Sequence, residues 1–154
     1  MDLSNSEPSG SKVLLWSPKY INNLAAAVRA CACWGADELL FTGSRIEHPE
    51  EARLPRELRM KAYADVVLTQ TARPFDLTHG YTPVCVELLN GAVPLTTFVH
   101  PPKAVYVFGP EDGSVPQVWR RLCHHFVYLP SAHCLNLAAT INVVLYDRAM
   151  KGGK

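Results

Sequence analysis

Three stretches of the chain combine polar or charged side chains with apolar surroundings, and each could carry chemistry. In the first, Arg29 is the single charged residue of the stretch 24–34, which is otherwise rich in alanine and other apolar residues. Burying a guanidinium without a partner is costly, so Arg29 must face water or a polar cleft. A solvent-facing arginine on an amphipathic helix is the simpler interpretation, and a cleft residue is the functional one.

The second stretch, Phe108-Gly-Pro-Glu-Asp-Gly113, directly follows the apolar run AVYV. Ligands of open α/β sheets bind beyond the carboxyl ends of the strands, and a loop with two glycines and two carboxylates there can approach a ligand closely. The alternative is an ordinary strand-to-helix turn in which Asp112 and Ser114 act as caps. The stretch contains neither the GK[ST] of a phosphate loop nor the GxGxxG of a dinucleotide site.

The third stretch, 129–140, runs from a predicted strand through a short loop into an apolar helix. Asn136 and Thr140 are four residues apart, so they lie on one face of that helix and form a polar stripe. A buried asparagine needs hydrogen-bond partners, and the simpler interpretation is that the neighbouring backbone supplies them. The functional interpretation is that the stripe faces a ligand.

The elements that position these stretches alternate between strands and helices. Short apolar runs predict strands at 13–16, 37–43, 65–68, 84–88, 95–98, 104–109 and 126–129. Helices are predicted at 24–34, with Asn22 or Asn23 as the N-cap and Gly35 as the terminator, at 114–123, capped by Ser114, and at 134–150. The alternation predicts an α/β fold with a mostly parallel sheet. Residues 13–150 form one domain after a flexible tail, 1–12.

Composition limits the classes of function. The chain has 154 residues and a net charge of +1, so RNA binding requires a local basic patch. The segment 45–61 supplies one candidate, in which we expect phosphate contacts from Arg53, Arg56, Arg59 and Lys61; a solvated surface loop is the alternative. No apolar run approaches the roughly 18 residues of a membrane span. Five cysteines without a secretion signal predict reduced thiols and a cytoplasmic protein.

Cysteine and histidine also occur close together in the second half of the chain, at Cys123, His124, His125, His133 and Cys134. Successive residues of one element point in different directions, and no CxxC pairs with a second half-site. The sequence therefore predicts no metal site.

Taken together, the three stretches resemble the three motifs of the SPOUT superfamily, TrmH (SpoU) branch. Asn23, Arg29 and Gly35 keep the spacing of the first motif, in which Ala25 replaces a glycine. The second motif is matched by 108–111. The third is matched by Leu129-Pro130 followed by Cys134-Leu135-Asn136, with cysteine where serine is usual. The resemblance covers roughly residues 13–150.

This resemblance implies a parallel sheet with helices on both faces, a C-terminal trefoil knot (the SPOUT fold) and a homodimer. It implies S-adenosyl-L-methionine-dependent methylation of a ribose 2′-hydroxyl in tRNA or rRNA. The small single-domain members that methylate the tRNA wobble ribose also carry Phe-Gly-Pro-Glu and Leu-Thr-Thr, which occurs here at 95–97, so tRNA is favoured. The alternative is a non-catalytic RNA-binding protein of the same fold, which the substitutions at Ala25 and Cys134 keep open.

The resemblance also implies individual roles. Arg29 would sit at the reactive hydroxyl or its phosphate, as a base or as an orienting group, Glu111 and Asn136 would orient Arg29 and the ribose, and Asn23 would be a further catalytic residue. Loop residues around the cofactor would be Leu95, Thr96, Gly109, Leu129, Cys134 and Leu135. Retention of all four polar residues favours the enzyme over the binding protein.

Overall fold

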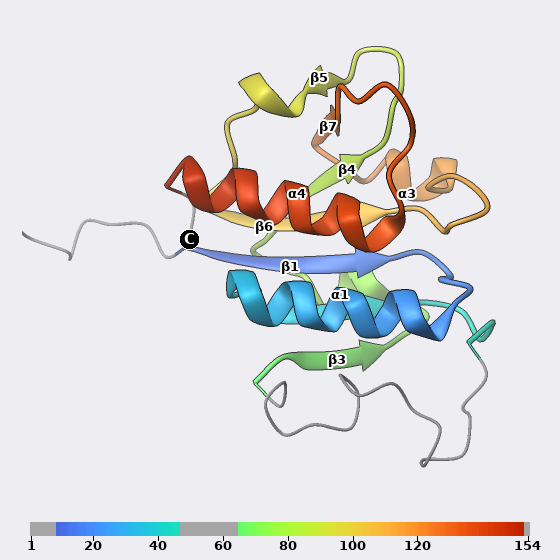
Figure 1. Ribbon diagram of the computed structural model, residues 1–154. Coiled ribbons are helices and arrows are strands. Elements are labelled where there is room, and N and C mark those ends of the chain that lie inside the picture. Colours follow the sequence, from blue (N-terminus) through green and yellow to red (C-terminus); the bar gives the residue numbers. More distant parts are fainter. Residues whose placement is uncertain (1–8, 47–64, 153–154) are drawn as a thin grey trace, which may run out of the picture.

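A seven-stranded parallel sheet forms the centre of the molecule (Figure 1). The computed structural model describes residues 9–46 and 65–152. The strand order is β3-β2-β1-β6-β4-β7-β5, and every recorded pair is parallel. The strands are β1 (Gly10–Leu15), β2 (Glu38–Phe41), β3 (Val67–Gln70), β4 (Thr82–Val86), β5 (Val93–Pro94), β6 (Lys103–Phe108) and β7 (His125–Tyr128). The predicted α/β fold with a parallel sheet is confirmed, and the knot stays a prediction from the resemblance.

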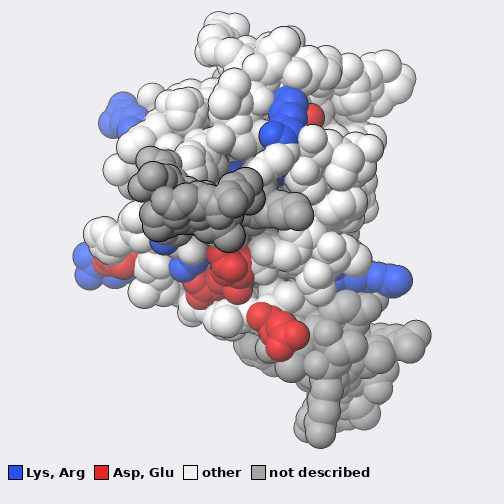
Figure 2. Space-filling model, turned by 90° about the vertical axis from the view of Figure 1, so that its left-hand side faces the viewer, with Lys and Arg blue, Asp and Glu red and all other residues white. Residues whose placement is uncertain are grey.

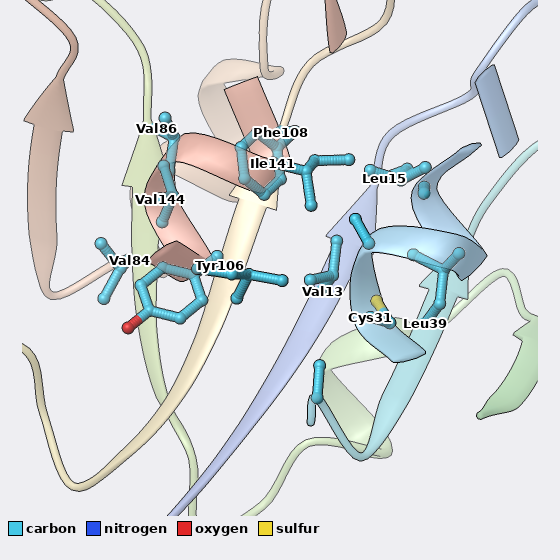
Figure 3. Close-up of a cluster of buried hydrophobic side chains, with 14 of the residues drawn as sticks. Val13, Leu15, Cys31, Leu39, Val84, Val86, Tyr106, Phe108, Ile141 and Val144 are labelled. Carbon is cyan, nitrogen blue, oxygen red and sulfur yellow. The ribbon is translucent and has the colours of Figure 1, made fainter. Parts of the chain in front are cut away.

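Two long helices, α1 (Ile21–Trp34) and α4 (Leu137–Met150), cover one face of the sheet and lie side by side (Figure 1). Alternate strand residues point toward them, as the period of two requires. Figure 3 shows this core, in which Val13, Tyr106 and Phe108 from the central strands meet Cys31 and Ile141 from the two helices. Both helices run opposite to the strands, so both begin at the carboxyl edge of the sheet.

The second face of the sheet packs against shorter elements. Leu14, Cys85 and Val107 point to this side and contact Trp119 of α3 (Gln117–Arg120). The ring of Phe75, in the 3₁₀ turn η3 (Pro74–Asp76), meets Trp119 edge-on at 5.3 Å. Helices on both faces were predicted, and this arrangement confirms them. None of the helices in the described ranges is long and apolar enough to cross a membrane.

The amino ends of the central strands are held by a buried arginine of the last helix. Arg148 is 2% exposed and donates to the carbonyl oxygens of Gly10, Pro101 and Pro102 and to the hydroxyl of Tyr106. These contacts join α4 to the start of both β1 and β6. On the same side of the molecule, the visible Lys and Arg side chains are spread over the surface, and several of them lie next to Asp or Glu side chains (Figure 2).

Several predicted boundaries are wrong at the ends of elements. The first strand begins at Gly10, so the predicted tail 1–12 overlaps β1, whose backbone pairs with β6 along its full length. The first long helix begins at Ile21, with Tyr20 rather than Asn22 or Asn23 at the N-cap. Gly35 does end this helix, with a positive φ of 72° and its N–H on the Cys31 carbonyl.

Two elements differ in kind from the prediction. Residues 95–98 were predicted to be a strand, but they form the 3₁₀ turn η4 (Leu95–Thr97), because Leu95 and Phe98 are three apart and a 3₁₀ turn buries both on one side. The predicted helix 114–123 shortens to α3, which begins after Pro116; Ser114 lies in the preceding loop and does not cap it. The last helix likewise begins at Leu137 rather than at 134.

Candidate active site

A cavity of about 740 Å³ opens at the carboxyl edge of the sheet, where the loops after β4, β6 and β7 meet the first turns of α1 and α4. Its volume is within the range of small-molecule sites, roughly 300–1,000 Å³. The inner lining is apolar, and the segment 131–136 forms an exposed border. The lining residues are Tyr20, Asn23, Val86, Glu87, Leu88, Phe108, Gly109, Pro110, Glu111, Gly113, Tyr128, Leu129, Ser131, Ala132, His133, Cys134, Leu135, Asn136, Leu137 and Thr140.

Glu111 connects the loop after β6 to the start of α1. Its Oε1 accepts the backbone N–H of Lys19 at 3.0 Å, and its Oε2 accepts the N–H of Tyr20 at 3.1 Å and the side-chain amide of Asn23 at 2.8 Å. A helix start has backbone N–H groups without intrahelical partners. The carboxylate therefore binds the backbone N–H of the N-cap residue Tyr20 and of Lys19 before it, and it fixes the orientation of the Asn23 amide.

The same contacts set the charge of Glu111. Burial alone would raise the pKa of this carboxyl, but the hydrogen bonds from Asn23 and from the backbone N–H groups of Lys19 and Tyr20 outweigh it, so the pKa lies below the ordinary value. Glu111 is consequently ionised at neutral pH. Glu111 was predicted to orient Arg29 and the ribose, and this role stays a prediction; the hydrogen bonds of Glu111 in the structure go to Lys19, Tyr20 and Asn23.

An ion pair holds the same loop from outside the cavity. Arg45 binds Asp112 with two parallel contacts, Nη1 to Oδ2 at 2.9 Å and Nη2 to Oδ1 at 3.0 Å, and its Nε donates to the carbonyl of Ser17 at 3.1 Å. The hydrogen bond from Arg45 holds the pKa of Asp112 below its usual value. Sequence reasoning missed this contact because Arg45 belongs to a charged segment that gives no sign of a partner in a distant loop.

Gly109 lies where the loop after β6 folds back on itself. A Cβ at this position would lie 2.9 Å from the backbone carbon of Ser114 and 2.9 Å from the backbone nitrogen of Val115. Backbone atoms have no room to move aside, so the loop requires glycine for its own packing. Gly109 also lines the cavity, as expected, but the contact that demands glycine is internal to the loop.

The third motif forms the opposite wall. Asn136 is the N-cap of α4, and its Oδ1 accepts the N–H of Ala139 at 2.8 Å. Thr140 donates its hydroxyl to the Asn136 carbonyl at 3.0 Å, and both residues line the cavity. The simpler interpretation of Asn136, satisfaction by neighbouring backbone, is therefore correct for its oxygen. Leu129, Cys134 and Leu135 line the cavity as predicted.

The prediction for Leu95 and Thr96 is wrong. Leu95 is buried in the core at 4% exposure, and Thr96 lines a different hollow with Lys151 and His100. They follow β5 at the edge of the sheet, whereas the cavity lies beyond the inner strands. The segment Val86–Leu88, at the end of β4, takes the place expected for 95–97. These residues could have been identified from the position of β4 between β6 and β7, but the sequence alone does not reveal this strand order.

Arg29 is exposed on α1 and is not among the cavity residues, although Asn23 on the same helix is. The predicted RNA contacts Arg53, Arg56, Arg59 and Lys61 lie outside the described residues. Within one chain, the structure thus brings together Asn23, Glu111 and Asn136 of the four predicted catalytic residues.

A parallel sheet with its ligand cavity at the carboxyl edge, formed by motif-bearing loops, is the architecture of α/β enzymes that bind a small cofactor. Residues 10–146 match the SpoU rRNA Methylase family. The chain belongs to this family, as the resemblance implied. A search of curated protein sequences found no match.

Solved structures share this fold at low sequence identity. An AdoMet-bound rRNA methyltransferase from Sinorhizobium meliloti superimposes with a TM-score of 0.77 at 20% identity, over 94% of this chain and 57% of that one. A TrmH/SpoU tRNA modifying enzyme from A. aeolicus gives 0.76 at 17%, over 94% and 76%. A protein described for 2-OH methylation of C/U34 on tRNA gives 0.76 at 18%, over 96% and 93%.

The chain spans 57% of the length of the Sinorhizobium meliloti protein, and 60% and 62% of the length of two structures of the SpoU methyltransferase AviRb from Streptomyces viridochromogenes. The protein that acts on tRNA C/U34 differs in this respect, because nearly its whole length is matched.

Proposed function

We propose that the protein is an S-adenosyl-L-methionine-dependent RNA ribose 2′-O-methyltransferase. The observation that carries the proposal is the single cavity that collects Asn23, Glu111 and Asn136, one from each of the three motifs. Membership of the SpoU rRNA Methylase family supports the reaction class. Several structures with this fold are named as methyltransferases, and two were determined with AdoMet.

The residues of the cavity fit this cofactor. Val86, Phe108, Leu129 and Leu137 provide an apolar surface for an adenine ring, and the described lining contains two carboxylates, Glu87 and Glu111, but no Lys or Arg. Such a lining disfavours phosphate-bearing ligands and accepts a ligand that carries a positive sulfonium. S-adenosylmethionine supplies an activated methyl group together with its own leaving group, so no metal is required.

The chain's own residues then have to position the hydroxyl. Methyl transfer needs the attacking oxygen, the methyl carbon and the sulfur in line, which is mainly a matter of orientation. Glu111 fixes the Asn23 amide at 2.8 Å, and Asn136 is fixed by its capping contact with Ala139. Both amides therefore meet an incoming ribose in fixed positions. Arg29 serves as the fork that holds the adjacent phosphate.

We further propose that the active form is a homodimer built on α1 and α4. On α4, Val143, Tyr146 and Met150 are 38%, 51% and 62% exposed, and Tyr146 meets Trp34 of α1 edge-on at 5.5 Å. Large apolar groups exposed together are typical of interfaces. Arg29 is exposed on α1, so an interface there brings a second copy's Arg29 to a cavity that lacks its own. A stable monomer in sedimentation at micromolar concentration would contradict this.

We favour tRNA over rRNA as the substrate, because the match to the C/U34 enzyme covers nearly all of both chains. We place the basic cluster at 53–61 against RNA phosphates, and the free cysteines agree with a cytoplasmic protein. Reversing the charges of Arg56 and Arg59 should flatten the dependence of RNA affinity on salt, since each lost phosphate contact lowers the slope.

Two measurements test the proposed reaction. Calorimetry of the purified protein with S-adenosylmethionine should show binding at about one site per chain. Transfer of a labelled methyl group to unfractionated tRNA, followed by mapping of 2′-O-methyl positions, should show one modified ribose. RNA binding without cofactor binding would instead support the alternative, a non-catalytic RNA-binding protein of the same fold.

A further inference from the structure

Glu87 is a carboxylate at the end of β4 that none of the three motifs includes. Its backbone N–H still pairs with the Val127 carbonyl of β7 at 2.9 Å, so its position is fixed by the sheet. Its Oε1 accepts the N–H of Val115 at 3.1 Å. That N–H belongs to the peptide against which Gly109 packs, so Glu87 anchors the loop of the second motif to the centre of the sheet.

The second oxygen of Glu87, Oε2, differs from the first in its hydrogen bonding. Oε2 is shielded from solvent and has no hydrogen-bond partner within the described ranges, and no Lys or Arg described there forms an ion pair with it. A buried carboxylate oxygen without a donor is costly. Because Glu87 lines the cavity, a ligand in the cavity can supply a donor. The terminal torsion of a glutamate is broad, so the carboxylate can turn toward that donor.

The other carboxylate of the cavity is not available for this purpose. Glu111 already accepts three hydrogen bonds, all from residues 19–23. Glu87 is therefore the carboxylate of the described lining in which one oxygen accepts no hydrogen bond.

The chemistry of the lining selects which part of the ligand reaches Glu87. The amino-acid end of S-adenosylmethionine carries an ammonium and a carboxylate, and the described lining offers no Lys or Arg to pair with that carboxylate. That end is better placed at the exposed border formed by 131–136. The nucleoside has no negative charge and fits the apolar interior, where its ribose hydroxyls are donors. A carboxylate at the end of a parallel strand also binds ribose hydroxyls in dinucleotide-binding folds.

We infer that Glu87 binds the ribose hydroxyls of the adenosyl cofactor and is thereby a specificity-determining residue of the cavity; the inference rests on the proposed function. Glu87 consequently has two tasks, since one oxygen anchors the loop and the other recognises the ligand. It selects for an intact ribose diol and against ligands that place an anionic group at the same point.

The test compares ligands on two proteins by calorimetry. Glu87→Gln keeps an oxygen for the Val115 N–H and removes the charge. We expect it to weaken S-adenosylhomocysteine and 5′-methylthioadenosine by the same factor, about tenfold or more, which is the usual effect of losing a hydrogen bond to a charged group. On the unaltered protein, the 2′,3′-dideoxy derivative of 5′-methylthioadenosine should bind weakly, and Glu87→Gln should not weaken it further.

Glu38→Gln is the matched control, because Glu38 is a part-buried carboxylate at the amino end of β2, where it binds Lys12 at 2.9 Å. It should leave every ligand affinity unchanged. A Glu87→Gln effect that disappears with 5′-methylthioadenosine would assign the carboxylate to the ligand's ammonium and overturn the inference. Unchanged affinities in the variant would overturn it too. Failure of the unaltered protein to bind any adenosyl ligand would overturn the proposed function as well.

Discussion

Replacing Glu111 by glutamine tests whether the loop of the second motif really caps α1. The carboxylate receives donors on both oxygens, from Lys19 and Tyr20 backbone and from the Asn23 side chain. A glutamine keeps one acceptor and points an NH₂ group at the remaining donors. At least one donor then loses its partner, and the charge near the helix start is lost as well.

The magnitude follows from these contacts. A hydrogen bond to a charged group contributes about 1.5–3 kcal/mol, and a charge at a helix start adds about 0.3–1 kcal/mol. Glu111 is only partly buried, so water replaces part of the loss, and we expect Glu111→Gln to cost about 1–2 kcal/mol. For a chain of this size that lowers Tm by about 2–8 °C. The rate of methyl transfer should fall as well, because the Asn23 amide loses its fixed orientation.

The stability that Glu111 contributes depends on pH. The pKa of Glu111 is lower in the folded protein than in the unfolded chain, so its contribution is complete above the unfolded value, about 4.3, and is lost as pH falls through the folded value. Thermal melting of both proteins should show a gap in Tm at pH 7 that narrows in acid. The control is Asp112→Asn in the same loop, whose exposed pair with Arg45 should matter less. Equal Tm values at pH 7, or a gap unchanged at low pH, would refute the capping role.

Three further predictions use other parts of the structure. Arg29→Ala should abolish methyl transfer to tRNA and leave Tm and cofactor affinity nearly unchanged, with poor rescue by Arg29→Lys because an ammonium lacks the planar fork; full activity would sink the proposed role. Gly109→Ala should lower both Tm and cofactor affinity, whereas Gly113→Ala should be tolerated because its Cβ would meet only Pro110 Cγ at 3.4 Å. Arg148→Met should cost about 3 kcal/mol, a fall in Tm of about 6–12 °C, since it leaves buried carbonyl groups without donors; a change below about 1 °C would contradict the buried clamp.

The sequence was sufficient for the fold class and for most strands, because short β-branched runs between glycine and proline allow few other structures. It predicted a strand at 95–98, where the structure has a 3₁₀ turn. The burial of Leu95 and Phe98, three residues apart, does not distinguish the two structures unless the position of the sheet edge is known. The sequence also assigned the N-cap of α1 to a local asparagine. The N-cap is Tyr20, and the carboxylate that accepts its N–H, Glu111, is 91 positions away along the chain.

The residues of the candidate site were likewise predicted only in part. Asn23, Glu111 and Asn136 were found because their spacing matches motifs, and spacing is a property of the sequence. Glu87 and Arg45 were missed because their importance comes from neighbours that only the folded chain supplies, a backbone N–H in one case and Asp112 in the other. Leu95 was expected at the cavity, where the structure instead has the end of β4. This error has the same origin, because the strand order decides which loops share a cavity.

The clamp formed by Arg148 has a consequence for synthesis of the protein on the ribosome. The first strand pairs with β6, which begins at residue 103, and both are held by Arg148, which lies 138 residues after Gly10. An emerging chain therefore has its first strand without a permanent neighbour on one side until most of the protein has been made. Such distant pairing slows folding and leaves strand edges exposed. We expect a chain truncated before Arg148 to aggregate, while the complete chain closes its centre in one late, cooperative step.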